Sequence, residues 1–143
     1  MPGDISDGEH LARYVRRKSI ITDRKDRSTI LGCFPDAFRL RADRNEQYLS
    51  TARMETYEGT PEEQVSAILT AMEVCGFKIE KGSGFVVGNV GRIKSVCASF
   101  RALHLPKYRR PAYAEAWGVP QDDNLLLERI GRFFWNNIIP SGK

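Results

Sequence analysis

Apolar positions recur at three- and four-residue spacing in TPEEQVSAILTAMEVCGF, which predicts an amphipathic helix. Thr60 and Glu63 have the spacing of a capping box, with Pro61 at the first helical position. Gly76 is the expected stop. We expect the apolar stripe to face the core; it consists of Val65, Ile68, Leu69, Met72 and Cys75.

The next segment changes from alternating to helical spacing. Alternation around a glycine-containing turn at 81–84 predicts a β-hairpin, with the apolar residues Phe77, Ile79, Phe85 and Val87. A helix is expected directly afterwards, with Asn89 as its cap. Its apolar face is formed by Val90, Ile93, Val96, Cys97 and Phe100.

The first half of the chain favours strands. HLARYV fits a strand better than a helix, and KSIITDRKDRSTILG is typical of a loop or a short hairpin. In AFRLRADRNEQYLSTARME, Phe38 and Leu40 alternate with two arginines, which predicts a half-buried strand. A second strand over 48–53 is expected to pair back on it across the turn ADRNEQ.

The last third predicts two strands and a helix. ALHLP and AYAEAWGV alternate weakly and are expected to be strands joined by the basic loop KYRRP. Asp122 or Asp123 can cap a final helix that ends before Pro140, with the apolar face Leu125, Leu126, Ile130, Phe133 and Phe134. The whole pattern predicts a single α+β domain over 1–143, with a mainly antiparallel sheet, about three helices and a flexible amino terminus at 1–8.

Composition narrows the class of protein. A chain of 143 residues with 41% hydrophobic residues is long enough for one buried core. No apolar run approaches the roughly 20 residues of a membrane-spanning helix, and no secretory signal is visible. The three cysteines are too far apart for a disulfide framework or a C-x-x-C zinc pair. We therefore expect a cytoplasmic protein without metal or cofactor that does not enter a membrane.

Charge is distributed unevenly. Lys and Arg number 22 against 18 Asp and Glu, so the net charge is only +4. Residues 81–114 contain no acidic residue and carry the cations Lys81, Arg92, Lys94, Arg101, Lys107, Arg109 and Arg110. This segment predicts either a positive stripe that attracts phosphates or an acidic partner, or a solvated surface whose counter-charges come from elsewhere.

The glycine-rich stretch GSGFVVGNVGRIKS satisfies neither the P-loop nor the dinucleotide-binding pattern. A strand running into a helix nevertheless offers backbone N–H groups to an anion at residues 88–91. The residues of this candidate anion site are Asn89, Gly91, Arg92 and Lys94. The alternative is a tight turn that needs glycine for its geometry.

Acid–base chemistry has few candidates. His104, at the end of an expected strand beside the basic loop, is a stronger one than His10, and a hydrogen-bonded structural role is the alternative for both. Cys33 lacks a neighbouring histidine and is expected to be buried filler. The arginines Arg39, Arg41 and Arg53 either converge on a phosphate or carboxylate beside Glu55, or pair across the ladder with Glu46 and Glu55.

The motifs HLARYV, AFRLRADRNEQYLS with the later ME, GNVG, LHLP and AYAEAWGVPQDD occur in this order. In this respect the chain resembles a family of short bacterial proteins with AF-x-L-R, LS, N-V-G and His-x-Pro motifs. The resemblance spans most of the chain and implies a cytosolic one-domain protein, without assigning a reaction. Relatives often carry a histidine where Tyr113 stands, so shared histidine chemistry is not expected here.

The leading hypothesis is a binding or adaptor module that recognises an anionic ligand through a basic face. That ligand is a nucleic acid, a nucleotide or an acidic protein partner, and the loop residues expected to contact it are Lys107, Tyr108, Arg109 and Arg110. Tyr108 and Tyr113 would allow stacking on unpaired bases.

Two other hypotheses stay open. One is a small hydrolase or transferase for a phosphate-bearing substrate, with His104 or His10 as acid–base, Arg39 and Arg41 as anion clamps and Glu55 as a second carboxylate. The other is a homo-oligomer that pairs through its last helix or a sheet edge.

Overall fold

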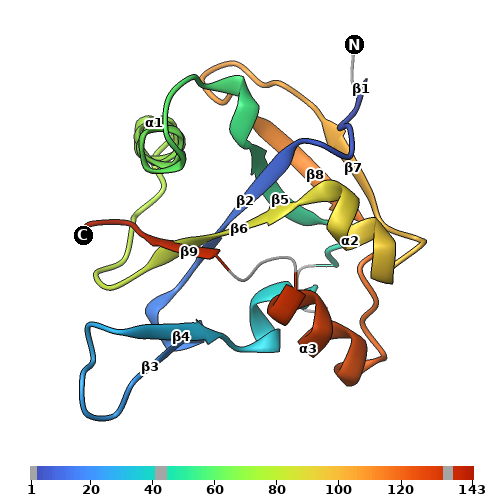
Figure 1. Cartoon of the computed structure of the whole chain (residues 1–143). Coiled ribbons are helices and arrows are strands. Elements are labelled where there is room, and N and C mark those ends of the chain that lie inside the picture. The colour runs from blue at the N-terminus through green and yellow to red at the C-terminus, as the bar shows by residue number, and fades with distance from the viewer. Residues whose placement is uncertain (1–2, 41–44, 134–136) are drawn as a thin grey trace.

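A seven-stranded antiparallel sheet organises the chain in a computed structural model that describes residues 3–40, 45–133 and 137–143 (Figure 1). Its order is β1 (Gly3–Asp4), β7 (Arg101–His104), β8 (Tyr113–Trp117), β5 (Leu49–Arg53), β2 (His10–Val15), β6 (Gly84–Asn89) and β9 (Asn137–Pro140). A separate hairpin pairs β3 (Ile20–Thr22) with β4 (Ile30–Cys33). The α-helices are α1 (Pro61–Val74), α2 (Val90–Val96) and α3 (Asn124–Phe133), and the 3-10 turns are η1 (Arg17–Ser19), η2 (Pro35–Phe38) and η4 (Met54–Thr56).

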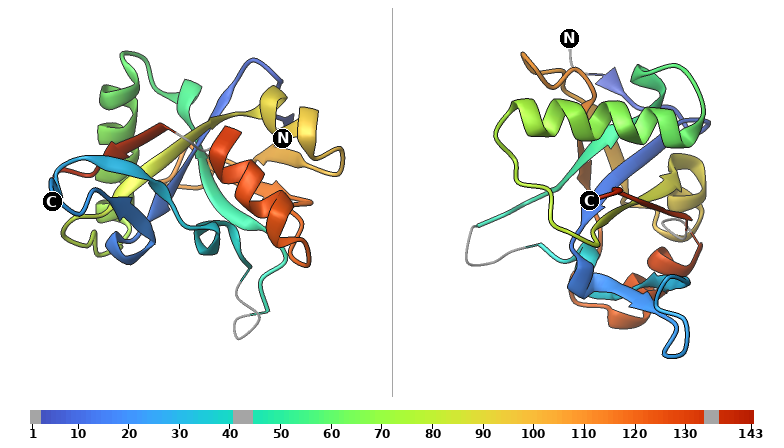
Figure 2. Two further views of the ribbon diagram at one scale, coloured as in Figure 1. Left: turned by 60° about the horizontal axis from the view of Figure 1, so that its bottom comes forward. Right: turned by 90° about the vertical axis from the view of Figure 1, so that its left-hand side faces the viewer.

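The sheet has a core on each face, as the side-chain alternation of a strand requires. On β2, Leu11 and Val15 belong to the core shared with α2, α3 and η2. Ala12 and Tyr14 point to the other face, where α1 covers them. Figures 1 and 2 show α1 on one side of the sheet, and α2 with α3 on the other. The predicted α+β class with a mainly antiparallel sheet is confirmed.

All three predicted helices form, and each begins at a cap that the sequence indicated. Thr60 Oγ1 accepts the Glu63 N–H at 3.2 Å, and a Glu63 carboxylate oxygen accepts the Thr60 N–H at 3.1 Å. Asn89 caps α2 by accepting the Arg92 N–H, and Asp123 accepts the Leu126 N–H in the first turn of α3. The strands over HLARYV, ALHLP and AYAEAWGV are also confirmed.

Two predicted strands are wrong. Residues 77–83 form no strand, and β6 pairs with β2 and β9 in place of the expected hairpin partner. The segment ending at Phe38 is the 3-10 turn η2, because Pro35 starts the turn and Phe38 is fully buried against α3. The pairing of β5 is therefore with β2 and β8. The sequence also gave no indication of β9.

The amino-terminal segment differs from the flexible terminus predicted for residues 1–8. Residues 3–8 are built into the fold: β1 pairs with β7, and Ile5 is only 2% exposed. Asp4 contacts Arg101 at 2.8 Å and Asp7 contacts Lys94 at 2.9 Å. The acidic terminus thus supplies counter-charges to the basic segment 81–114.

Cys75 is exposed, although its spacing predicted a place in the core. The helix α1 ends at Val74, and Gly76 turns the chain away with a φ of +89°. The apolar stripe of α1 that is actually buried therefore ends at Met72.

Gly118 provides a sharp test of backbone packing. Its φ is +77°, and a Cβ atom there would lie 2.0 Å from the Ser99 carbonyl oxygen. We expect Gly118→Ala to lower the free energy of unfolding by at least about 3 kcal/mol, because both the conformation and the contact oppose a side chain. Urea denaturation followed by far-ultraviolet circular dichroism measures this change.

Gly76→Ala is the matched control. Its φ of +89° is similar, but nothing lies within 4 Å of the added Cβ. It should cost only about 1 kcal/mol of conformational strain. Equal losses in the two variants would contradict the close packing of Gly118 on Ser99.

Candidate functional site

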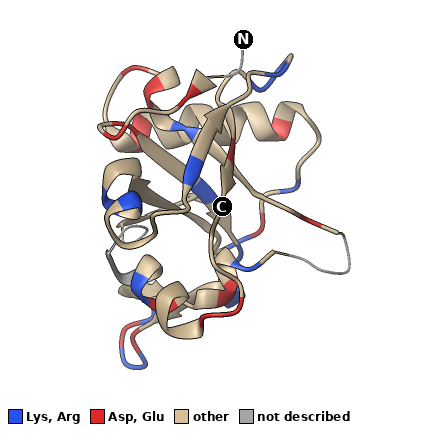
Figure 3. Ribbon diagram, turned by 90° about the vertical axis from the view of Figure 1, so that its right-hand side faces the viewer, with Lys and Arg blue, Asp and Glu red and all other residues tan. Residues whose placement is uncertain are grey.

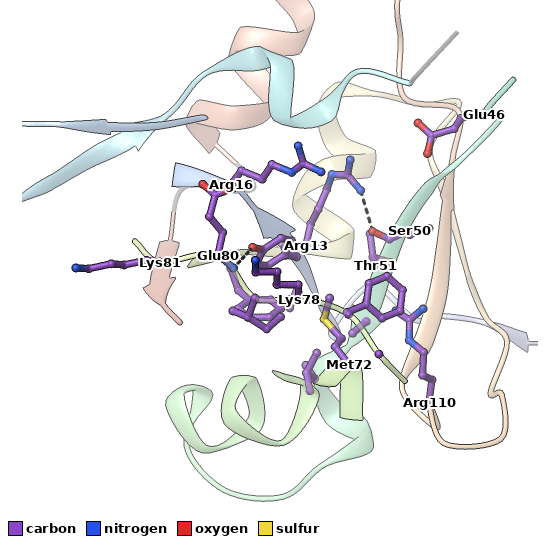
Figure 4. A pocket seen from close by; sticks show the side chains of 18 residues that line it. Arg13, Arg16, Glu46, Ser50, Thr51, Met72, Lys78, Glu80, Lys81 and Arg110 are labelled. Carbon is purple, nitrogen blue, oxygen red and sulfur yellow. Dashed lines mark hydrogen bonds between the residues drawn. The ribbon is translucent and has the colours of Figure 1, made fainter. Parts of the chain in front are cut away.

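A cleft of about 930 Å³ opens beside the two central strands. β2 and β5 pair only at Leu11 with Arg53 and at Ala12 with Ala52. Beyond these pairs Arg13, Tyr14, Ser50 and Thr51 line the cleft. Its remaining walls come from α1, β6, Glu46, the segment 76–81 and Arg110 (Figure 4).

Apolar and aromatic side chains line the inner wall of the cleft. Ile68 and Met72 come from α1 and are almost fully buried, as is Phe85 of β6. Tyr14 packs edge-on against Phe85 with 5.6 Å between ring centroids. The Tyr14 hydroxyl also accepts the Glu80 N–H at 2.9 Å, which fixes the segment 76–81 against β2. Of the large apolar side chains in the lining, Phe77 is 47% exposed and can contact a ligand.

Positive charge predominates among the lining residues. Five cations, Arg13, Arg16, Lys78, Lys81 and Arg110, face two carboxylates, Glu46 and Glu80. Within the described residues, none of Arg16, Lys78, Lys81 and Arg110 forms an ion pair. Figure 4 shows Arg13, Arg16, Lys78 and Arg110 around the opening, whereas Lys81 extends away from it. The cleft is thus suited to an anion.

Arg13 connects β2 and β5 beyond their last pair of residues. Its Nε donates to the Ala37 carbonyl at 2.6 Å, and its Nη1 donates to the Ser50 carbonyl at 2.9 Å. Burial lowers the pKa of this guanidinium to about 10, while Glu46 opposes the shift. Arg13 therefore stays charged at neutral pH, with donors already committed to the backbone.

Arg110 is the residue of the predicted basic loop that reaches the cleft. Its guanidinium carbon lies 4.9 Å from the ring centroids of both Phe77 and Tyr113, as expected for cation–π contact. Lys107 Nζ lies 3.9 Å from the Tyr113 centroid, and burial raises the pKa of the Tyr113 hydroxyl. Tyr113 therefore supports two cations. Tyr108 and Arg109, the two residues between Lys107 and Arg110, form the tip of the turn between β7 and β8.

The predicted anion site at the start of α2 has its backbone donors occupied. Val90 N–H donates to Glu9 O, Gly91 N–H to Asp7 O and Arg92 N–H to Asn89 Oδ1, all at about 3.0 Å. A Cβ on Gly91 would lie 2.9 Å from the Asp7 oxygen. The glycine turn thus accommodates the amino-terminal segment. Lys94 is paired with Asp7, and Figure 3 shows basic and acidic segments interspersed on this side.

His10 and Glu55, two of the three catalytic candidates, are in contact. His10 Nδ1 lies 2.7 Å from Glu55 Oε2, and the His10 backbone N–H donates to Oε1 at 2.8 Å. The third candidate, His104, makes its ring contact through Nε2 with the Pro111 carbonyl at 2.8 Å. The sequence ranked His104 above His10, whereas the structure places His10 beside the carboxylate.

Arg39 and Arg53, two of the arginines predicted to converge on one anion, have different partners. Arg53 Nη2 donates to Glu9 Oε1 at 2.6 Å. Arg39 donates to Asp36 at 3.2 Å and also contacts Asn124, so the expected pairing with Glu46 or Glu55 is wrong for Arg39. Arg41 lies outside the described residues.

The surroundings of Cys33 do not favour the reactive thiolate form. Burial raises the pKa of its thiol to about 11, so the group is protonated at neutral pH. Cys97 is buried as predicted, with its sulfur near the Gly118 carbonyl.

Sequence reasoning missed most of the cleft. Arg13 and Arg16 belong to RYVRR, where the sequence predicted a strand and assigned no role to either arginine. Lys78 lies in the segment predicted to be a hairpin strand. The arginines on both sides of Val15 were the feature of the sequence that could have indicated the cleft. Their convergence with Arg110 depends on pairing between strands that are distant in the sequence.

Comparison with known proteins gave no match among family models, curated proteins or solved structures. The resemblance to short bacterial proteins therefore stays a prediction. In the part of the chain that the structure describes, no group of His, Cys, Asp and Glu has the arrangement of a metal site. No helix there has both the length and the apolarity needed to cross a membrane.

The Glu9–Arg53 pair predicts a pH-dependent contribution to stability. The hydrogen bond from Arg53 lowers the pKa of Glu9, with a smaller contribution from His104. The pair therefore stabilises the fold above the unfolded pKa of about 4.3, and this is lost as pH falls through the folded value. Glu9→Gln should lower the free energy of unfolding by about 1 kcal/mol at pH 7 and by nearly nothing once the pH is below the folded pKa.

Asp4→Asn is the control for this measurement. Its carboxylate also pairs with an arginine, but both partners are more than 60% exposed and are screened by solvent. Its effect at pH 7 should be smaller in chemical denaturation. A Glu9→Gln loss that is independent of pH would show that the charge pair is not its source.

Proposed function

We propose that the protein is a binding module for an anionic ligand with a flat apolar part, and that a nucleotide is the chemistry the cleft fits best. The observation that carries the proposal is the set of cations without ion-pair partners in the described residues, placed around an apolar cleft. Such unneutralised charge raises the local concentration of anions.

The shape of the cleft favours a small ligand over an extended acidic protein surface. A volume of about 930 Å³ lies in the range of small-molecule sites, which bury most of their ligand. Phe77, which lines the cleft and is 47% exposed, offers apolar contact to a base, while Lys78 and Arg110 lie at the opening, where phosphates keep part of their hydration.

Nucleotide binding can be tested by isothermal titration calorimetry with ATP, thymidine monophosphate, pyrophosphate and adenosine. Lys78→Gln and Arg110→Gln should each weaken ATP binding about tenfold, because each removes a charged contact. Binding should also weaken as salt rises from about 50 to 200 mM.

Lys25→Gln is the matched control, because Lys25 is exposed in the β3–β4 turn and does not line the cleft. It should leave ATP affinity unchanged. Absence of nucleotide binding at low salt, or an equal loss in the Lys25 variant, would contradict the proposal.

A second candidate, hydrolysis of a phosphate-bearing substrate, is favoured by the 2.7 Å contact of His10 with Glu55. When Glu55 accepts the Nδ1 proton, Nε2 is left to take a proton from an attacking water. Chromatography of ATP incubated with the protein tests this candidate. Product that disappears in His10→Asn and Glu55→Gln would support it, and intact ATP would contradict it.

A further inference from the structure

Tyr108 stands at the tip of a tight turn beside the cleft. Lys107 and Arg110 bond to each other through both backbone groups, with N···O distances of 3.0 and 2.9 Å. Only Tyr108 and Arg109 lie between them, and the Tyr108 side chain is 90% exposed. A fixed backbone therefore presents a bare aromatic ring to solvent.

Arg109 occupies a backbone conformation that favours glycine. Its φ is +70°, which costs a residue with a Cβ about 1 kcal/mol. Its guanidinium carbon lies 5.5 Å from the Tyr108 ring centroid, and its carbonyl accepts the Cys75 thiol at 3.7 Å. Glycine would adopt this backbone conformation without strain. Any advantage of arginine at this position must therefore come from its side chain.

The turn is continuous with the cleft. Arg110 belongs to both, and its guanidinium carbon lies 4.9 Å from the ring of Phe77, which lines the cleft and is 47% exposed. The Cys75–Arg109 contact holds the tip against the end of α1, and Figure 2 shows the β7–β8 connection lying beside that helix. From the cleft to the tip there follow one aromatic ring, Phe77, the two cations Arg110 and Arg109, and a second ring, Tyr108.

We infer that the ligand is a single strand of nucleic acid, with one nucleotide in the cleft and a following base stacked on Tyr108. This inference rests on the proposed function. Two exposed rings with cations between them match two bases joined through phosphate in an unpaired strand. A duplex hides its base faces, and an acidic peptide has no regular series of rings to stack.

The central experiment compares thymidine monophosphate with oligothymidylates of about 4 to 12 nucleotides by fluorescence anisotropy and calorimetry. The oligonucleotides should bind at least about tenfold more tightly than the monophosphate. Tyr108→Ala should remove about tenfold of oligonucleotide affinity, the value of one stacked base, and leave the monophosphate unchanged.

Arg109→Gly separates binding from folding. The substitution should raise the urea midpoint, because it relieves the left-handed strain, and should weaken oligonucleotide binding severalfold. These opposite signs exclude a folding defect as the cause of weaker binding. Asn45→Gly is the matched control, since Asn45 has a φ of +52° and does not belong to the β7–β8 turn, so this variant should keep full affinity.

Three results would overturn the inference. Oligonucleotides that bind no more tightly than the monophosphate would show that the ligand ends in the cleft, and the proposed function would stand. Equal affinity for duplex DNA, or for polyglutamate, would show attraction to charge without stacking. If the monophosphate and ATP both fail to bind, the proposed function itself fails.

Discussion

The separation of β2 from β5 is the constraint on which the rest of the molecule depends. Two central strands of an antiparallel sheet normally satisfy each other's backbone groups along their length. Here the ladder stops after Ala12 and Ala52, and Arg13 donates to Ser50 and Ala37 where it has stopped. One side chain thus joins β2 to β5 and to η2 where the ladder has ended, and it also lines the cleft.

The cations of the basic segment 81–114 also fall into two groups, those with and those without an ion pair. Asp4 and Asp7 of the amino-terminal segment neutralise Arg101 and Lys94 at the β1–β7 edge and at α2. In the described residues, Lys81, Lys107, Arg109 and Arg110 have no carboxylate in an ion pair. The fold therefore neutralises two of the seven cations of this basic segment, and it places Lys81 and Arg110, which are not neutralised, in the lining of the cleft.

Local signals predicted the fold where the interactions themselves are local. The caps at Thr60, Asn89 and Asp123 lie within three residues of their partners, so α1, α2 and α3 could be read from the sequence. Strand partners are distant: β6 alternates as expected, but its neighbours β2 and β9 lie far away in the chain. The cleft was difficult to predict for the same reason. Arg110 was found because its own loop is basic, whereas Arg13 became a site residue only through the gap between two strands.

The wall of the cleft is fastened by the last strand of the described fold. Gly82 N–H donates to the Lys143 carbonyl, Ser141 N–H donates to the Ser83 carbonyl, and Gly84 pairs with Pro140. The segment 76–81 is thereby held between Tyr14 of β2 and a strand that follows every other element in sequence. During synthesis the ribosome delivers β2, β5, β6 and α1 well before β9. Ile139 of β9 also belongs to the core beneath α1, so the strand that completes this core is the one that fastens the wall of the cleft.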